Sequence, residues 1–353
     1  MKTSRESVTE SPSYPGPDGD LRLFGQGDGA QEVSFHGLAA SSFRQHTDDG
    51  EGADFDPSMD PTGKKIVFAS TRHSPESHLY IKPADGAVLT QITDAHANDA
   101  QPVFSPDGMS IAFASDRGGQ WDIWIVDADG RNPRQITSHR LPELHPSWSP
   151  DGRRLVFCRV NPRVGGGELW MAEIDSPGVR QLIGEGLFPS WSPMGTKIVF
   201  QKARARGSRW FSIWTLEWRD GEALFPTEIA SSPDAALIAP CWSPDGTQIA
   251  FTQVFTNDAA SDGATGPGVS GQGRADIATV DVDGRGMLRL TNGGGQNYSP
   301  AWSIDGRIYF TAKRQDTESI WSLRPAGRSD LPIEESGGTS GRQAAFRPEP
   351  SAP

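Results

Sequence analysis

Seven polar residues stand where this chain could do chemistry, in the connectors that precede its strand-like runs. Five of the seven are carboxylic acids, so a fold that gathers them would focus a negative potential there. A cation, or a peptide that carries Lys or Arg, is the natural guest of such a potential. The alternative is that they are solvated loop side chains that also accept hydrogen bonds from backbone N–H groups at turns. The seven are Asp54, Asp56, Asp99, Glu143, His145, Glu185 and Asn297.

A metal site is a second possibility within the same region. His96, Asp99, Glu143 and His145 come from adjacent connectors and could in principle bind a divalent metal. Their spacing is not a ligand motif, and histidines on loops are more often simply solvated. We therefore expect no resident cofactor, with these four as the only metal candidates.

Three further motifs favour simpler explanations. The run Asp127-x-Asp129-Gly130 lacks the third acid, the glycine offset and the closing Glu of a calcium loop, so it predicts a hairpin turn. Residues 266–271 fit the GxGxxG pattern, but no helix follows them, as a dinucleotide site would require. The sequence contains no GxSxG nucleophile elbow, which speaks against a hydrolase of that type.

The elements that would position these residues come from a repeat. A phrase close to aromatic-Ser-Pro-Asp-Gly recurs with its glycine at 63, 108, 152, 195, 246 and 306, at intervals of 45, 44, 43, 51 and 60 residues. Proline presets φ and glycine permits a positive φ, so each copy predicts a tight turn. A period of about 40 to 45 residues with fixed turns is typical of a β-propeller blade. The copies are Met59-Asp60-Pro61-Thr62-Gly63, Phe104-Ser105-Pro106-Asp107-Gly108, Trp148-Ser149-Pro150-Asp151-Gly152, Trp191-Ser192-Pro193-Met194-Gly195, Trp242-Ser243-Pro244-Asp245-Gly246 and Trp302-Ser303-Ile304-Asp305-Gly306.

Each repeat carries four strand-like runs. After the strand that ends at the aromatic residue come runs such as Ile111-Ala112-Phe113, Ile123-Trp124-Ile125 and Gln135-Ile136-Thr137. We predict an all-β, six-bladed β-propeller with four antiparallel strands per blade. The last repeat lacks a clean fourth strand, and Phe43-Arg44-Gln45-His46-Thr47 fits its pattern, so we expect this N-terminal strand to close the last blade and remove exposed edges. The alternative for that place is Leu331-Pro332-Ile333-Glu334, in which the proline disfavours a strand.

In such a ring, the seven polar residues crowd round one mouth of the central channel. Trp148, Trp191, Trp242 and Trp302 occupy equivalent positions and are expected to fill the space between blades. Residues 257–274, dense in Gly, Ser, Ala and Asp, are expected to form a mobile loop in the fifth blade.

Composition narrows the class of partner. The net charge of −12 and the absence of a basic run argue against nucleic acid. Cys158 and Cys241 fall in different repeats and predict buried free thiols rather than a disulfide or a metal site. No stretch approaches the roughly 18 apolar residues of a membrane span. Residues 1–20 lack the apolar core of a secretory signal, so we expect a cytoplasmic protein or a true start upstream.

The repeat resembles that of the TolB-like propellers, a WD40-like repeat also called PD40. The resemblance covers about residues 43–324, and the second copy is nearly a consensus one, with Asp122-Ile123-Trp124 followed by Asp129-Gly130. It implies a protein-binding scaffold in a periplasmic, Tol-Pal-like cell-envelope complex. Propellers with the same repeat are also found in kinase-linked sensors, in peptidases and in a pectic-oligosaccharide lyase family.

We therefore predict a monomeric propeller over residues 43–324, between a flexible segment at 1–42 and a flexible tail at 325–353. Its expected function is non-enzymatic binding of a protein or peptide partner at the channel mouth, with a basic partner or an envelope lipoprotein as the candidates. Two alternatives stay open. One is a metal-assisted lyase or hydrolase acting on an oligosaccharide, and the other is a cytoplasmic sensor propeller.

Overall fold

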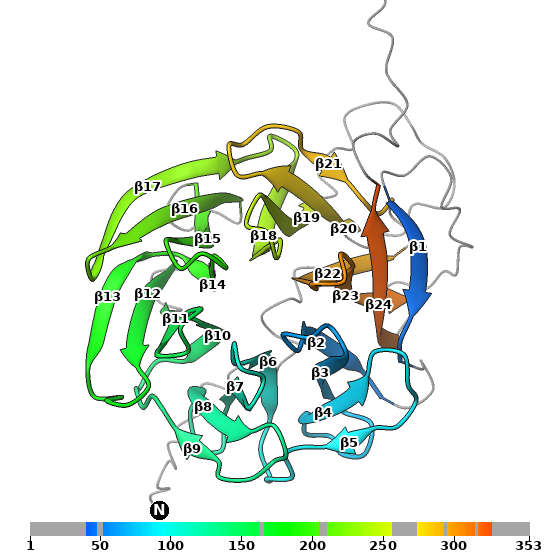
Figure 1. Ribbon diagram of the computed structural model, residues 1–353, viewed down its shortest axis with the longest axis vertical. Coiled ribbons are helices and arrows are strands. Elements are labelled where there is room, and N and C mark those ends of the chain that lie inside the picture. Colours follow the sequence, from blue (N-terminus) through cyan, green and yellow to red (C-terminus); the bar gives the residue numbers. More distant parts are fainter. Residues whose placement is uncertain are drawn as a thin grey trace, which may run out of the picture.

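The computed structural model describes residues 40–47, 52–161, 166–204, 210–255, 274–292, 295–314 and 317–326. These residues form 24 β-strands, and none of them lies in a helix. The sheets stand like spokes around a common centre, with β2, β6, β10, β14, β18 and β22 innermost (Figure 1). The terminal segments and the loop at 257–274 that were expected to be flexible lie outside the described residues, apart from residues 40–42, 274, 325 and 326.

Four sheets contain four antiparallel strands each, in chain order from the centre outward. The first holds β2 (Asp54–Met59), β3 (Lys65–Ser70), β4 (His78–Pro83) and β5 (Thr90–Gln91). The second holds β6 (Asp99–Phe104), β7 (Ser110–Ser115), β8 (Asp122–Asp127) and β9 (Arg134–Gln135). The third holds β10 (Glu143–Trp148), β11 (Arg154–Asn161), β12 (Gly166–Glu173) and β13 (Arg180–Glu185). The fourth holds β14 (Leu187–Trp191), β15 (Lys197–Ala203), β16 (Phe211–Arg219) and β17 (Glu222–Ala230).

The remaining eight strands form one sheet. They are β18 (Ala235–Trp242), β19 (Gln248–Phe255), β20 (Arg274–Asp281), β21 (Leu288–Arg289), β22 (Gln296–Trp302), β23 (Ile308–Arg314), β24 (Thr317–Pro325) and β1 (Ala40–Gln45). A single parallel pair, Ala275 with Gln296, joins β20 to β22, and every other pairing in this sheet is antiparallel. The strand pairing of this sheet therefore falls into two four-stranded groups that one residue pair joins.

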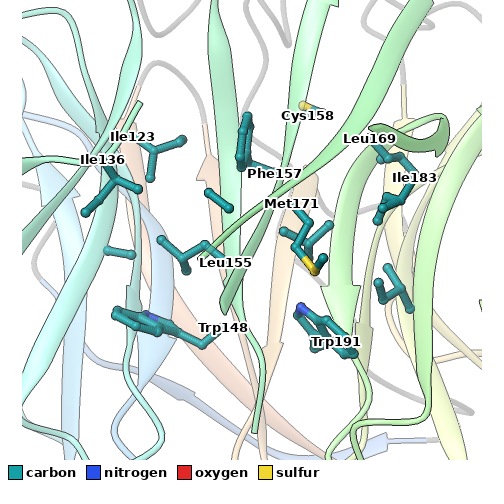
Figure 2. Packing of buried hydrophobic residues seen from close by; sticks show 14 of the residues in the cluster. Ile123, Ile136, Trp148, Leu155, Phe157, Cys158, Leu169, Met171, Ile183 and Trp191 are labelled. Atoms are coloured by element: carbon teal, nitrogen blue, oxygen red, sulfur yellow. The ribbon is translucent and has the colours of Figure 1, made fainter. Parts of the chain in front are cut away.

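The second strand from the centre carries a continuous apolar run because both of its faces are covered. Ile66 to Ala69 in β3 and Ile111 to Ala114 in β7 are each fully buried. A strand with two buried faces has no polar side, which explains its continuous run of apolar residues. One hydrophobic cluster includes Ile123 of β8, Leu155 and Phe157 of β11, and Trp191 of β14, so the core runs between sheets (Figure 2).

The Ser-Pro-Asp-Gly phrase forms the predicted turn after the innermost strand. The Gly108 N–H donates to the Ser105 carbonyl at 2.8 Å, and Gly108 has φ 70°, which a residue with a Cβ rarely adopts. The Ser105 hydroxyl donates to Asp107 Oδ1 at 2.6 Å and accepts from the Ser110 N–H at 2.9 Å. The hydrogen bond from Ser105, with that from the Met109 N–H, lowers the pKa of the Asp107 carboxyl.

Successive turns pack against each other. A Cβ placed on Gly108 would lie 3.3 Å from Cδ of Pro61, and one placed on Gly246 would lie 3.3 Å from Cγ of Pro193. The first turn meets the last, since a Cβ on Gly63 would lie 3.1 Å from Ile304 Cγ2. The turn of the first repeat thus packs against the turn of the last repeat.

The N-terminal strand lies beside the last one. β1 pairs with β24 in antiparallel register, from Ala40 with Pro325 to Gln45 with Trp321. The strand begins at Ala40 and ends at Gln45, whereas the sequence predicted residues 43–47. His46 and Thr47 extend the attachment through the His46 N–H, which donates to the Ile320 carbonyl at 2.7 Å, and the Thr47 hydroxyl, which accepts from the Ile320 N–H at 2.9 Å.

Candidate binding cavity

Every innermost strand contains the same irregularity. At one position a non-glycine residue has a positive φ of 50–55°, and a proline follows it. The register of the innermost strand against its neighbour shifts at each of these positions, as in a β-bulge. A left-handed conformation at a non-glycine residue is uncommon and is often associated with functional sites. The six bulge residues are Asp56, Gln101, His145, Phe188, Ala239 and Ser299.

The six bulges surround a central cavity of about 350 Å³. Each bulge residue lines it together with the proline that follows, and Pro193 and Pro244 line it as well. Three of the repeated tryptophans, Trp191, Trp242 and Trp302, also line it. The sequence predicted these tryptophans only as core, and Trp191 and Trp242 are indeed more than nine-tenths buried while still facing the cavity.

Neighbouring bulge residues contact one another around part of the wall. The Ser299 hydroxyl donates to Asp56 Oδ1 at 2.8 Å, and Gln101 Oε1 accepts from the His145 N–H at 2.8 Å. The His145 imidazole stacks on the Phe188 ring, with 3.5 Å between centroids and 26° between planes. These contacts fix side chains from different sheets in one wall.

The wall is divided into a polar side and an apolar side. Ser299, Asp56, Gln101 and His145 follow one another on β22, β2, β6 and β10, whereas Phe188 and Ala239 occupy β14 and β18. β2 and β14 lie across the centre from each other (Figure 1). The cavity can therefore hold a guest that is polar on one side and apolar on the other.

The titratable groups of the wall are mostly neutral. Burial lowers the pKa of the His145 imidazole to about 3 and raises the pKa of the Cys241 thiol to about 12. Among the described residues that line the cavity there is no Lys, Arg or Glu, and Asp56 is the one Asp. At neutral pH the formal charge of this wall thus comes from a single carboxylate.

Four of the seven predicted polar residues lie two positions before a bulge, and each has an arginine partner. Buried ion pairs join Asp54 to Arg72 (2.6 Å), Asp99 to Arg117 (2.8 Å) and Glu143 to Arg159 (2.8 Å). Arg314 Nη2 donates to Asn297 Oδ1 at 2.8 Å.

These arginines also lie over aromatic rings of their own sheets. The Arg117 guanidinium is 5.1 Å from the centroids of both Phe113 and Trp124, and that of Arg159 is 4.0 Å from the centroid of Trp170. We call Asp54, Asp99, Glu143 and Asn297, with their arginine partners, the rim. Because each of its three carboxylates is paired with a cation, the negative potential expected there is largely cancelled.

Glu185 is placed differently from the other six predicted residues. The position two residues before the fourth bulge is Gly186, and Glu185 precedes it with a side chain that is 81% exposed and 3.8 Å from the Lys202 ammonium. The structure thus brings Asp56 and His145 to the cavity wall and keeps Asp54, Asp99, Glu143 and Asn297 in the paired rim. Their role in binding stays a prediction.

The candidate metal ligands are not gathered. His96 is exposed, while Asp99 and Glu143 are occupied by their arginines. Within the described ranges, no group of three or more His, Cys, Asp or Glu side chains could hold a metal ion. The GxGxxG run at 266–271 lies outside the described residues. The Asp127-x-Asp129-Gly130 run forms the predicted hairpin turn, in which the Gly130 N–H donates to the Asp127 carbonyl at 2.8 Å.

The cysteines and the cavity wall hold two features that the sequence analysis missed. Both cysteines are free, as expected, but only Cys158 is buried in the core, and Cys241 lines the cavity. Gln101, Phe188, Ala239 and Ser299 were not singled out. A signal for them exists, because each precedes a proline that stands two residues before the repeated aromatic residue.

Two family models match this chain over more than half of its length. Residues 6–215 match the TolB beta propeller domain, and residues 120–331 match the Tricorn protease N-terminal beta propeller domain. Two curated relatives match parts of this chain. One match covers 100 residues, or 27% of that relative's length, and the other covers 69 residues, or 10% of that relative's length. In the part of the chain that the structure describes, no helix has the length and hydropathy of a membrane span.

Solved structures of several kinds share this architecture. The putative TolB from Agrobacterium tumefaciens is 23% identical, with a TM-score of 0.56 over 77% of this chain and 90% of that chain. The gluconolactonase XC5397 from Xanthomonas campestris is 15% identical, with a TM-score of 0.59 over 86% and 99%. An oligogalacturonate lyase from Vibrio parahaemolyticus is 12% identical, with a TM-score of 0.53 over 87% and 100%. At these identities the likeness establishes the fold alone.

Proposed function

Because this chain belongs to the TolB β-propeller family, we propose that it is a non-enzymatic binding scaffold whose central cavity holds a segment of a protein or peptide partner. One observation carries the proposal. Six equivalent backbone positions have the same strained conformation and the same following proline, yet they carry six different side chains. A uniform frame with a varied lining is what selective binding requires, because the frame fixes geometry and the lining supplies specificity.

We infer that the frame is a closed ring of six blades. The eight-stranded sheet counts as two blades, since only the pair of Ala275 with Gln296 joins its halves. β1 then completes the sixth blade by its pairing with β24, and the contact of Gly63 with Ile304 supports closure between the first and last blades. The sequence predicted the propeller over residues 43–324; because β1 begins at Ala40 and β24 ends at Pro325, we propose that it extends from about residue 40 to 325.

Co-purification with a narrowed cavity tests the binding function. In an Ala239→Phe variant, a further aromatic ring enters the wall at the bulge, as phenylalanine already does at the equivalent position Phe188 of the neighbouring blade. We expect wild-type protein to retain a partner that this variant loses, and a Phe225→Ser variant on the outermost strand β17 to retain it as well. If all three proteins retained the partner equally, the cavity would not be the binding site.

An enzymatic function has less support. The lyase and the gluconolactonase share only the fold with this chain. The predicted metal ligands His96, Asp99, Glu143 and His145 do not form a group that could hold a metal ion within the described residues. We propose the cell envelope as the compartment, by resemblance to TolB-like proteins, with a cytoplasmic sensor as the alternative. Fractionation of native cells, with detection of this chain in periplasmic and cytosolic extracts, decides between them.

A further inference from the structure

The central cavity extends from the bulges toward one end of the channel. On every innermost strand, its described lining begins at the bulge residue and continues toward the repeated turn, as in residues 188–191 and 239–242. Two lining residues, Pro193 and Pro244, belong to the turns themselves, and both are exposed. The cavity therefore opens at the face formed by the repeated turns, whereas the rim lies at the other end of the innermost strands.

Two of the repeated turns place a large apolar side chain on this face. The fourth turn has Met194 where four other turns have Asp, and the sixth has Ile304 where the other five have Pro. The side chain of Met194 is 74% exposed, and that of Ile304 is 65% exposed. Both turns still close, because the Gly195 N–H donates to the Ser192 carbonyl at 2.9 Å and the sixth turn has the same bond.

Met194 gives up hydrogen bonds that an Asp makes at the equivalent position. In the fifth turn, Asp245 Oδ1 accepts from the Ser243 hydroxyl at 2.6 Å and from the Thr247 N–H at 3.0 Å. A thioether sulfur is only a weak acceptor, so methionine does not replace these bonds. An apolar side chain in water gives the folded chain no burial energy in return. Departures from a local rule without an internal gain are expected at functional positions.

The exposed apolar side chains adjoin the aromatic half of the cavity. Phe188 and the three lining tryptophans come from β14, β18 and β22, which are the innermost strands of the last three repeats (Figure 1). Met194 follows β14, and Ile304 follows β22. A Cβ placed on Gly246 would lie 3.9 Å from Met194 Cγ, so Met194 lies beside the turn that carries the exposed Asp245. Apolar surface thus continues from the cavity onto the turn face, next to a carboxylate.

Resting on the proposed function, we propose that the partner enters the cavity from the turn face, through an apolar segment that covers Met194 and Ile304 and carries a Lys or Arg beside Asp245. An apolar side chain of this segment lies against Phe188 and the tryptophans. The Ser243 hydroxyl lowers the pKa of the Asp245 carboxyl, so this group is charged at neutral pH. An opposite charge on the partner complements it, which mainly orients the segment and speeds its association.

Selection of displayed random dodecapeptides against purified full-length protein tests this. A Met194→Asp/Ile304→Pro variant restores the Ser-Pro-Asp-Gly pattern in both turns, so it should keep the fold while it removes both exposed side chains. Met194→Asp alone leaves the sixth turn unchanged and gives a second test. Met109→Asp makes the same exchange at a 70% exposed methionine after the second turn, and is the matched control. Ala239→Phe reports whether binding uses the cavity.

We expect wild type and Met109→Asp to enrich the same peptides, with apolar residues next to a Lys or Arg. A synthetic peptide from this set should bind the double variant about tenfold more weakly, because two apolar contacts are lost. With its Lys or Arg replaced by norleucine, it should bind wild type about two- to fivefold more weakly, because an exposed ion pair contributes little. Equal binding of that analogue would overturn the basic residue of the proposal.

The remaining outcomes separate this inference from the function on which it rests. Peptides that Ala239→Phe loses and both Met194→Asp variants retain would overturn entry from the turn face and leave the proposed function standing. Peptides that bind all variants equally, or a wild-type protein that enriches none, would overturn both. Binding that is lost in the double variant but kept in Ala239→Phe would confine the contact to the surface and also overturn both.

Discussion

Arg117 and Asp99 illustrate how single residues hold this molecule together. The Asp99 side chain is fully buried, and Arg117 is its cationic partner, at 2.8 Å. Removing one partner of such a pair leaves a charge in the protein interior without compensation, which costs about 3–5 kcal/mol. The same arrangement recurs in Asp54 with Arg72 and in Glu143 with Arg159, so the same cost applies to removing one partner of either pair.

We expect Arg117→Met to lower the free energy of unfolding by about 3–5 kcal/mol, measured by urea denaturation at neutral pH. Arg131→Met is the matched control, because Arg131 is 81% exposed and lies 3.7 Å from an exposed Asp129. That variant should change stability by less than about 0.5 kcal/mol. Equal effects of the two substitutions would contradict the structural role of the buried pair.

Acid sensitivity is a second consequence at the scale of residues. Burial lowers the pKa of His46 to about 4 and that of His145 to about 3, so the unfolded chain takes up these protons first as the pH falls below about 6.5. Stability from both histidines is therefore full above pH 6.5 and lost on acidification. Asp122 acts in the opposite direction between about pH 4 and 6, because burial raises its pKa to about 6.

Two histidines outweigh one carboxyl group, so we expect a net loss of about 1.4 kcal/mol per pH unit between pH 6 and 4 from these three groups. His145→Asn should remove about that much of the slope, and asparagine accepts the positive φ of this position. Urea denaturation across pH 4–7.5 measures it, with His96→Asn at an exposed site as the control. A slope that is unchanged in His145→Asn would show that His145 is not held neutral.

At the scale of elements, the N-terminal strand protects the edge of β24. Beyond its backbone pairing, His46 contacts Ser322 Oγ at 2.8 Å and the Ala84 carbonyl at 3.1 Å, which are on the last and first sheets. Lys82 Nζ donates to the His46 carbonyl at 2.5 Å. A short segment therefore bridges two sheets that are distant in sequence.

We expect a chain that begins at residue 48 to aggregate and to unfold at a lower temperature than one that begins at residue 40, because loss of β1 exposes a long unpaired edge. Light scattering and calorimetry on both truncations measure this. Matching behaviour of the two proteins would mean that β1 does not protect the edge.

The sequence predicted much of this architecture and a smaller part of the site. The Ser105 to Gly108 turn and the Ile111 to Phe113 strand follow from local chemistry that repeats, so spacing alone reveals them. The rim acids were identified, but their arginine partners were not, because pairing joins residues 16 to 18 positions apart on neighbouring strands. The recurring Ser70-Thr71-Arg72 and Ser115-Asp116-Arg117 after the second strand was an available signal.

The bulges were harder to predict for a physical reason. His145 and Asp56 attracted notice as polar residues, whereas Phe188 and Ala239 look like ordinary strand residues. What makes them equivalent is a positive φ before proline: the repeated proline marks the position, but neither phenylalanine nor alanine favours a positive φ. The same limit explains why Glu185 was chosen in the fourth repeat, one residue before the equivalent Gly186.

At the scale of the whole molecule, repeated sheets surround a central cavity whose lining varies from sheet to sheet. The packing of each turn on the next, such as Pro61 against Gly108, repeats the same interface. The side chains at the bulges differ from sheet to sheet, and the cavity is lined by the carboxylate of Asp56 on β2 and the ring of Phe188 on β14. A net charge of −12 over the whole chain keeps such a surface soluble and favours cationic partners.

Photo-crosslinking from the cavity wall tests the binding function most directly. Benzoylphenylalanine at Phe188 places a reactive group in the cavity, and the same residue at Phe225 places it on the outer strand, where the side chain is 65% exposed. In native cells, we expect ultraviolet light to crosslink position 188 to a protein segment that mass spectrometry identifies. Position 225 should not form this crosslink, and the Ala239→Phe substitution should abolish it. Adducts that form equally from both positions, or that persist in Ala239→Phe, would contradict a binding function for the central cavity.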